Sequence, residues 1–221
     1  MSDILTAQDL PEILQNFEKV YVIDTEYYPQ PGLPDGPVVP VALQAYEVRA
    51  GTWTSAFFDE PRGTYTNPLD PFALYLTFNA SPEWNSLLSL GWELPRNCID
   101  LYIEFKNEVS ALKPPPQFRQ HNSPGRWKSS LLDVVQWCGF PARPTAQKTE
   151  MRDLILRGHP FSEKERDLIL SYCSDDVIDT AVAAKAMLLR IGSIPQAIFR
   201  AHFMRAVANI HRAGIPTDAG A

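Results

Sequence analysis

Segments that favour β-strands fill the first half of the chain, and segments that favour helices fill the second half. Strand-forming runs occur at 19–28, 37–60 and 72–79, a helical pattern at 81–92, and a short strand leading into a helix at 97–108. The run at 37–60 contains the turn Arg49-Ala50-Gly51 and therefore predicts a hairpin. This order predicts an α/β fold, with a mixed β-sheet core flanked by helices.

The second half predicts a helical C-terminal part. Helical patterns occur at 128–140, at 150–192 with breaks at 158–162 and near 173–176, and at 193–215. Gly214 is placed to end the last helix, on which His202 and His211 are expected at the surface or in packing. Near the start, residues 2–14 predict a short capped helix. For the helix at 81–92 the expected N-cap is Ser81, with Pro82 at its first position.

Length and composition indicate an ordinary globular chain of one main domain. The chain has 221 residues, 45% of them hydrophobic, and a formal net charge of −6. This charge excludes a protein that is basic throughout, although an acidic protein can bind nucleic acid through a local groove or through metal ions. Cys98, Cys138 and Cys173 are far apart, so we expect reduced core thiols rather than a zinc site or disulfides. With no signal-peptide pattern and no 18-residue apolar run, we expect a cytoplasmic protein without a membrane span.

Two acids, Asp24 and Glu26, interrupt the first apolar strand. Residues two apart on a strand lie on the same face, so the two carboxylates are placed to share a metal ion. A D-x-E pair is also common at an ordinary strand end. Taken alone it predicts a metal site only weakly.

Three further acids lie at places where they can approach this pair. Glu83 falls in the first turn of the helix after Asn79, where an acid is also favoured by the helix dipole. Asp100 ends a short apolar strand, where a carboxylate is costly unless it has a partner. Asp176 lies four residues after Tyr172, so these two share one face of a helix.

A basic and aromatic segment, residues 113–128, differs in charge from the rest of the chain. It contains no acid, and its candidate nucleic-acid contacts are Lys113, Arg119, His121, Arg126, Trp127 and Lys128. Cations and aromatic rings on a flexible loop suit the phosphates and bases of a single strand. A solvated Pro-rich loop is the alternative interpretation.

Taken together, the three acidic motifs resemble those of the DEDDy 3′→5′ exonucleases. That family includes the proofreading domains of family A DNA polymerases and the ribonuclease D-like enzymes. The resemblance extends from about residue 18 to 190, in the order D-x-E (Asp24, Glu26), N-x-x-x-acid (Asn79, Glu83) and Y-x-x-x-D (Tyr172, Asp176). It implies a ribonuclease H-like fold and a metal-dependent hydrolase. One departure is Glu83, which stands where the family usually has Asp.

The resemblance also implies roles for these residues. Asp24, Glu26 and Asp176 would hold one Mg²⁺ or Mn²⁺ ion, and a second ion would rest on Asp24 with Glu83 reaching it through water. Tyr172 would orient the attacking water in a two-metal-ion hydrolysis that releases nucleoside 5′-monophosphates. Asp100 is the rival to Glu83, or a supporting residue.

The expected partner is the 3′ end of single-stranded DNA, which we expect Thr25 and Asn79 to contact beside the catalytic residues. Residues 199–218 resemble the segment through which family A polymerases leave the exonuclease domain. We therefore expect an exonuclease domain at 1–191 and a junction-like segment at 192–221, with a polymerase region in the same or a separate chain. The alternatives are an RNA 3′-end trimming enzyme and a catalytically weak or inactive nucleic-acid-binding or docking module.

Overall fold

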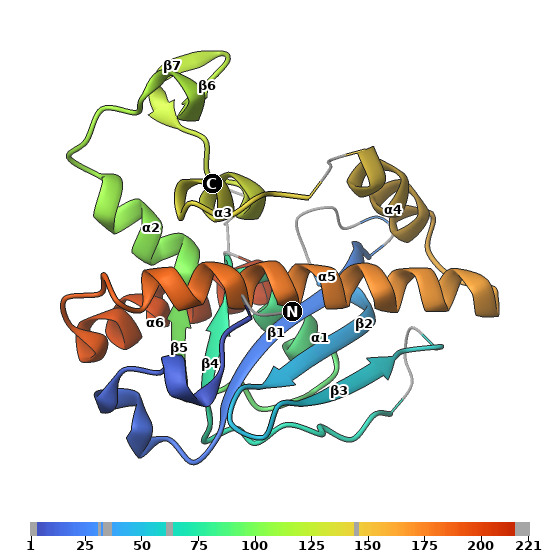
Figure 1. Cartoon of the computed structure of the whole chain (residues 1–221). Coiled ribbons are helices and arrows are strands. Elements are labelled where there is room, and N and C mark those ends of the chain that lie inside the picture. Colours follow the sequence, from blue (N-terminus) through green and yellow to red (C-terminus); the bar gives the residue numbers. More distant parts are fainter. Residues whose placement is uncertain (1–3, 31, 33–36, 61–63, 144–145, 215–221) are drawn as a thin grey trace, which may run out of the picture.

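The computed structural model of the chain describes residues 4–30, 32, 37–60, 64–143 and 146–214. Its centre is a five-stranded sheet (Figure 1). In spatial order the strands are β3 (Thr52–Phe57), β2 (Val38–Glu47), β1 (Val20–Pro29), β4 (Leu74–Thr77) and β5 (Asn97–Asp100). The first three strands pair antiparallel, whereas β4 and β5 run parallel to β1. The predicted mixed sheet and the hairpin at 37–60 are confirmed.

Helices cover both faces of the sheet. Alternation along β1 sends Val20 and Val22 into one apolar cluster, which includes residues of α5 (Glu163–Met187) and α2 (Leu101–Val109). Tyr21 and Ile23 enter a second cluster on the other face, with residues of α1 (Ser81–Ser89) and α6 (Ile194–Ala213). In Figure 1 the long helix α5 crosses the face of the sheet. The result is the predicted α/β fold, with β1 buried in the middle.

Two further helices complete the layer that contains α5. Helix α3 (Leu131–Trp137) contributes Val134 and Val135 to the first cluster. Helix α4 (Ala146–Arg157) packs against β1 and α5 through a third cluster that contains Tyr28 and Ile155. Helix α4 therefore lies beside the end of β1 at which the two predicted acids are found.

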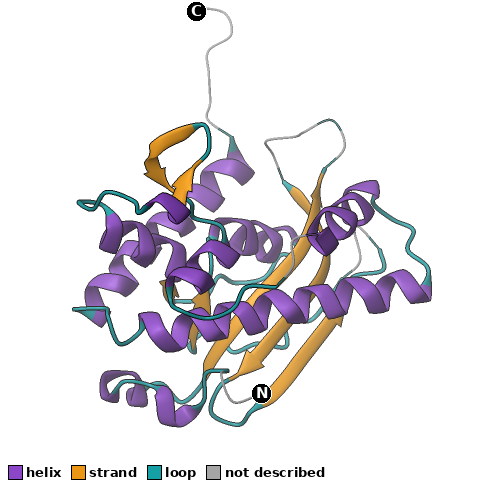
Figure 2. Cartoon of the chain, turned by 45° about the horizontal axis from the view of Figure 1, so that its top comes forward, coloured by secondary structure: helices purple, strands orange, loops and turns teal. Residues whose placement is uncertain are grey.

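The segment 113–128 is not the flexible loop that the sequence predicted. It forms a short 3₁₀ helix, Pro116–Phe118, followed by a second sheet of two strands, β6 (Arg119–Gln120) and β7 (Ser123–Trp127). This hairpin projects away from the main sheet (Figure 2). Its base is fixed by the indole of Trp127, which is buried and donates from Nε1 to the carbonyl of Leu112 at 3.0 Å.

Three smaller predictions about helices were also wrong. Helix α5 continues without a break through 173–176, because its apolar residues there, Cys173 and Val177, are fully buried and hold the helix in place. The N-terminal helix is replaced by two 3₁₀ helices, Ala7–Asp9 and Glu12–Asn16. Helix α1 begins one residue earlier than expected, with Ala80 at its N-cap.

Other predictions about the chain are confirmed. Gly214 has a φ of 71° directly after α6, a conformation that favours glycine at a helix end. Cys98 and Cys173 are buried, Cys138 is half-buried, and all three are free thiols. No helix in the described ranges has both the length and the apolar character required to cross a membrane.

Candidate metal centre

Strand β1 brings Asp24 and Glu26 to the same face of the sheet. Both side chains are half-buried, and the strand bulges directly after Glu26, where the register against β2 shifts. Bulges increase the local twist of a strand and redirect its side chains. Between the two acids, Thr25 points to the opposite face, where its hydroxyl donates to Ser86 of α1 at 3.1 Å. Thr25 is thus buried, and its side chain is not exposed to a nucleic acid.

Helix α5 brings the third motif to the same place. The thiol of Cys173 lies 3.3 Å from both the carbonyl oxygen and Oδ2 of Asp24, which fixes the helix against the strand. Ligand atoms of Asp24, Glu26 and Cys173 all lie within 4.8 Å of one another. One turn of α5 places Asp176 near this group, and the phenol of Tyr172, on the same face of α5, interacts with the charge of Asp176.

The two rival acids, Glu83 and Asp100, have different environments. Asp100 is fully buried, and its carboxylate accepts from the backbone N–H groups of Asn79 at 3.0 Å and Ala80 at 2.8 Å. It also caps α2, accepting from Tyr102 at 2.9 Å and from the next residue. Glu83 is 5% exposed, and the structure gives its Oε2 atom no hydrogen-bond partner. This geometry suits Asp100 to holding the turn after β4, and leaves a Glu83 oxygen available to a ligand.

The carboxylates perturb one another. Burial and the charge of Asp176 raise the pKa of Asp24 to about 8. Burial, followed by the charge of Asp24, raises the pKa of Glu26 well above its usual range, and the same two causes act on Glu83. Glu83 and Asp24 therefore lie close enough to interact, although Glu83 belongs to α1, which packs on the sheet face opposite to α5. Without a cation, these acids disfavour each other's ionised forms.

Two cations partly balance this charge. Lys148 of α4 places Nζ 2.9 Å from Oδ1 of Asp176. Arg143, which precedes α4, donates from Nε and Nη2 to Asp179 at 3.1 and 2.7 Å. Arg143 also contacts Asp175 at 2.6 Å, so Asp175 forms an ion pair. The Asp175 side chain is also 38% exposed, so it both forms this ion pair and meets solvent.

The donor set fits a hard divalent cation. Mg²⁺ and Mn²⁺ prefer oxygen ligands, and here carboxylates from β1, α1 and α5 converge, one of them with a buried oxygen that lacks a partner. The thiol is not suited to the same role, because burial and then the charges of Asp24 and Glu26 raise the pKa of Cys173 well above its usual range. A protonated thiol is a poor ligand. Asp24, Glu26, Glu83 and Asp176 are therefore the candidate metal ligands.

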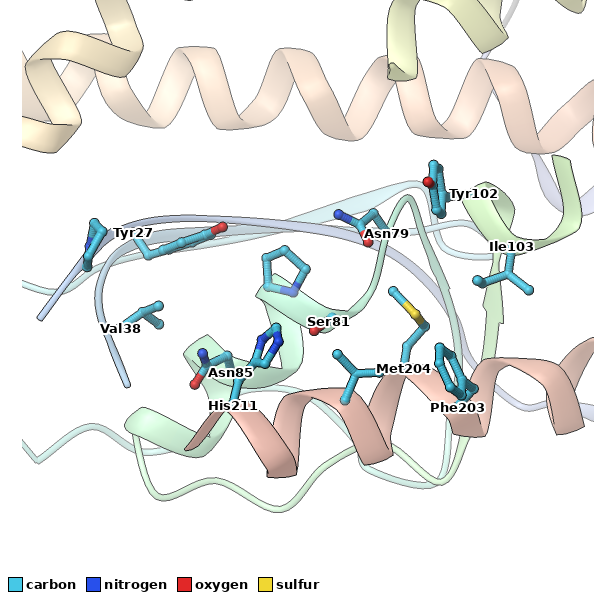
Figure 3. A pocket seen from close by; sticks show the side chains of 13 residues that line it. Tyr27, Val38, Asn79, Ser81, Asn85, Tyr102, Ile103, Phe203, Met204 and His211 are labelled. Carbon is cyan, nitrogen blue, oxygen red and sulfur yellow. The ribbon is translucent and has the colours of Figure 1, made fainter. Parts of the chain in front are cut away.

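Two cavities flank these acids on opposite sides of β1. One, of about 720 Å³, lies between β1, α4 and α5 and is lined by Glu26, Lys148 and Tyr172 among others. The other, of about 560 Å³, lies between β1, α1, α2 and α6 (Figure 3). Tyr27 lines both cavities. Burial, followed by the charges of Glu83, Glu26 and Asp24, raises the pKa of Tyr27 to about 12.

The predicted nucleic-acid contacts have different environments. Asn79, with a φ of 66°, lines the second cavity. Of the contacts predicted within 113–128, the exposed ones are Lys113, Arg119, His121, Arg126 and Lys128. Trp127 is 8% exposed, and its ring packs against Phe105 and Phe118, so it is not free to stack on a base. That expectation for Trp127 is corrected.

Sequence reasoning missed four residues of this region: Tyr27, Arg143, Lys148 and Cys173. Tyr27 directly follows the D-x-E pair, and Cys173 lies inside the Y-x-x-x-D motif, so their positions were a usable signal. Arg143 and Lys148 come from a segment with no motif. Only the packing of α4 against β1 and α5 brings them to the acids.

Comparison with known proteins finds likeness in structure alone. No protein-family model matches the sequence, and no curated protein matches it significantly. Among solved structures, one described as the apo form of a nuclease aligns with a TM-score of 0.61 at 16% identity, covering 98% of this chain and 94% of that one. RNase D of Trypanosoma brucei, in complex with RNA U12, aligns with a TM-score of 0.55 at 16% identity, covering 94% of this chain and 68% of that one. The Nibbler EXO domain of Aedes aegypti aligns with a TM-score of 0.45 at 14% identity, covering 89% and 90%.

The first two likenesses, together with the strand order, establish the fold. This chain, with a mixed five-stranded sheet and helices on both faces, shares its fold, of the ribonuclease H-like type, with these two structures. The fold that the resemblance implied is confirmed.

Proposed function

We propose that the protein is a metal-dependent 3′→5′ exonuclease that hydrolyses the terminal phosphodiester of single-stranded nucleic acid. The observation that carries this proposal is that Asp24 and Glu26 lie together on β1 and interact with the charges of Glu83 and Asp176, while a buried Glu83 oxygen has no hydrogen-bond partner. Buried like charges are costly, and a bound divalent cation together with a substrate phosphate offsets that cost. The nuclease-like fold supports the same conclusion.

The residues of this chain would divide the work by position. Two divalent ions, when bound, would supply Lewis-acid stabilisation of the attacking and leaving oxygens. Asp24, Glu26 and Asp176 would hold one ion, and Asp24 and Glu83 the other. Tyr172 keeps its proton, because burial and then the charge of Asp176 raise its pKa. Its phenol can therefore orient a water molecule by hydrogen bonding beside Asp176.

Two observations bear on the sugar of the substrate. The RNase D neighbour was solved with RNA, which supports an RNA 3′ end as the substrate. The similarity of residues 199–218 to the polymerase junction supports DNA, although 215–218 lie outside the described residues. A polymerase region as partner belongs to the DNA version of the proposal. With either substrate we propose an exonuclease part at 1–191, a junction-like segment at 192–221 and a cytoplasmic location.

A binding module without catalysis is the second candidate. The observation in its favour is the pair of cations, Lys148 and Arg143, which already neutralise acids of α5. A protein that uses this surface only for docking would keep such ion pairs and would not require a metal ion.

The products of digestion test the proposal and choose the substrate. We expect single-stranded 12-nucleotide DNA or RNA, incubated with the protein and Mg²⁺ or Mn²⁺, to yield nucleoside 5′-monophosphates by liquid chromatography. Nucleoside 3′-monophosphates, or internal fragments alone, would exclude the proposed chemistry. No product from either substrate would favour the binding module. The ratio of the two rates identifies the preferred sugar.

A further inference from the structure

The cavity on the α1 side has one wall made by α6. Phe203, Met204, Val207 and His211 line this wall, and Asn79, Ser81 and Tyr102 lie among the residues across the space (Figure 3). Its volume of about 560 Å³ lies within the range of small-ligand sites, roughly 300–1,000 Å³. Tyr27 and Pro82 line the cavity, and they are the direct chain neighbours of Glu26 and Glu83, so the cavity borders the two elements that carry these candidate metal ligands.

Helix α6 also presents aromatic rings to solvent. Phe203 is 64% exposed and Phe199, one turn earlier, is 76% exposed. Both line a groove of about 570 Å³ with Ile103, Arg200 and His202. Since Phe203 and Ile103 line this groove and the cavity alike, the two spaces adjoin and form one path along α6.

The charge of α6 is opposite to that of the chain. It carries three arginines and two histidines and contains no Asp or Glu, whereas the whole chain has a net charge of −6. His202 is exposed and lines the groove beside the phenylalanines, and His211 and Arg212 are exposed in the last turn of the same helix. Exposed rings along a path without acids match a single strand, whose bases stack on aromatic faces and whose phosphates attract cations.

The wall is held firmly in place. Ala201, Met204 and Ala208 are buried against the sheet face that contains Tyr21. On the same helix, Arg200 donates from Nε to Glu104 of α2 at 2.8 Å, and Arg205 donates to the carbonyl of Pro95 at 2.8 Å. The exposed rings therefore project from a packed helix, as a stacking platform requires.

We propose that α6 is the strand-binding wall of the protein, with Phe203 and Phe199 as successive stacking platforms for the bases of a single-stranded nucleic acid. The inference rests on the proposed function for the position of the 3′ end at the acids. In this arrangement the rings of α6 stack on the bases, and Trp127, whose ring is buried, does not.

Binding without catalysis tests this inference. Fluorescence anisotropy with labelled 12-nucleotide oligo(U) and oligo(dT), in EDTA, would compare the natural protein, the double variant Phe199→Ala/Phe203→Ala and the control Phe72→Ala. Phe72 is likewise exposed, at 60%, but it stacks under Arg96 away from the cavity. We expect binding about 25-fold weaker or more in the double variant, since each lost ring costs about fivefold or more, and no change in the control. A Phe203→Tyr variant should bind like the natural protein.

Other outcomes would overturn the inference. Equal affinity of the natural protein and the double variant, at unchanged melting temperature, excludes α6 as the wall. A double variant that changes the oligomeric state in light scattering but not oligonucleotide affinity would show that the rings pair copies of the chain. If binding falls as expected while no mononucleotides are ever released, the proposed function fails and this inference stands. If mononucleotides are released and binding does not fall, the proposed function stands and this inference fails.

Discussion

The ammonium nitrogen of Lys148 lies 2.9 Å from Oδ1 and 3.2 Å from Oδ2 of Asp176. The same nitrogen lies 5.8 Å from the centre of the Tyr172 ring. A cation from α4 thus occupies the approach to an acid that we propose as a metal ligand. In this arrangement Lys148 competes with a metal ion for Asp176.

Removing Lys148 should therefore strengthen metal binding. For Lys148→Gln we expect an apparent Kd for Mn²⁺ lower by about tenfold or more, because a charge-assisted hydrogen bond to a carboxylate contributes about 1.5–3 kcal/mol and no longer has to be broken. Isothermal titration calorimetry measures this value. Lys164→Gln, at an exposed position of α5, is the control and should leave the Kd unchanged. Weaker Mn²⁺ binding in Lys148→Gln would contradict the competition.

Glu83 is expected to lower the stability of the metal-free protein and to support activity when metal is bound. Glu83→Gln removes a buried charge that interacts with Asp24, so the metal-free melting temperature at pH 8 should rise. Activity with Mg²⁺ should fall by about 10- to 100-fold, as for the loss of a residue that supports a metal site. Differential scanning fluorimetry and the chromatographic assay measure the two effects. Glu93→Gln, at an exposed site, should change neither.

Asp100 should behave as a structural acid. Asp100→Ala leaves backbone N–H groups of the turn after β4 and of the first turn of α2 without an acceptor, so the free energy of unfolding should fall by about 2 kcal/mol or more. Urea denaturation measures this loss. Asp133→Ala removes an exposed capping acid of α3 and should cost less. If Asp100→Ala kept full stability and lost metal binding, Asp100 and not Glu83 would be the third ligand.

Stability without metal should depend on pH in a definite direction. The pKa of Asp24 is raised from 3.8 to about 8, so the folded state keeps a proton that the unfolded state loses. The stabilisation is complete below about pH 4 and disappears as the pH rises towards 8, at up to about 1.4 kcal/mol per pH unit for each such group. Melting temperatures in EDTA should thus fall from pH 5 to pH 8. Added Mg²⁺ should raise the melting temperature more at pH 8 than at pH 5, and an equal rise at both would refute this coupling.

Tyr172 should affect turnover rather than metal binding. Tyr172→Phe keeps the ring and removes the hydroxyl beside Asp176, so kcat should fall by about 100-fold while the Kd for Mn²⁺ stays the same. Tyr65→Phe is the control, because within the described part of the chain the Tyr65 hydroxyl bonds to Glu60, away from the acids. A Tyr172→Phe variant with unchanged kcat would remove Tyr172 from the proposed mechanism.

Much of the fold could be predicted because local patterns agree with it. The β-formers of 19–28 and 37–60 pair as their turn suggested, and Asp24 and Glu26 share a face because strand residues alternate. The unbroken α5 could not be predicted, since polar residues at 174–176 suggest a break unless the burial of Cys173 and Val177 is known.

The site was only partly predictable, because the choice among its acids also depends on packing that local sequence does not reveal. Motif spacing indicated the acids, but the choice between Glu83 and Asp100 depends on which carboxylate the backbone already occupies, and that is a matter of three-dimensional packing. Lys148 reaches Asp176 across 28 residues, a contact that no local pattern encodes.

The central claim is that Asp24 and its neighbouring acids remove nucleotides from a 3′ end. The most direct measurement follows a 5′-labelled single strand, with its 3′ end either free or blocked, on a denaturing gel with Mg²⁺ or Mn²⁺. We predict a ladder that shortens one nucleotide at a time from the free 3′ end only, and no ladder with Asp24→Asn. Shortening of the blocked strand, internal cuts, or an unchanged ladder with Asp24→Asn would contradict the account.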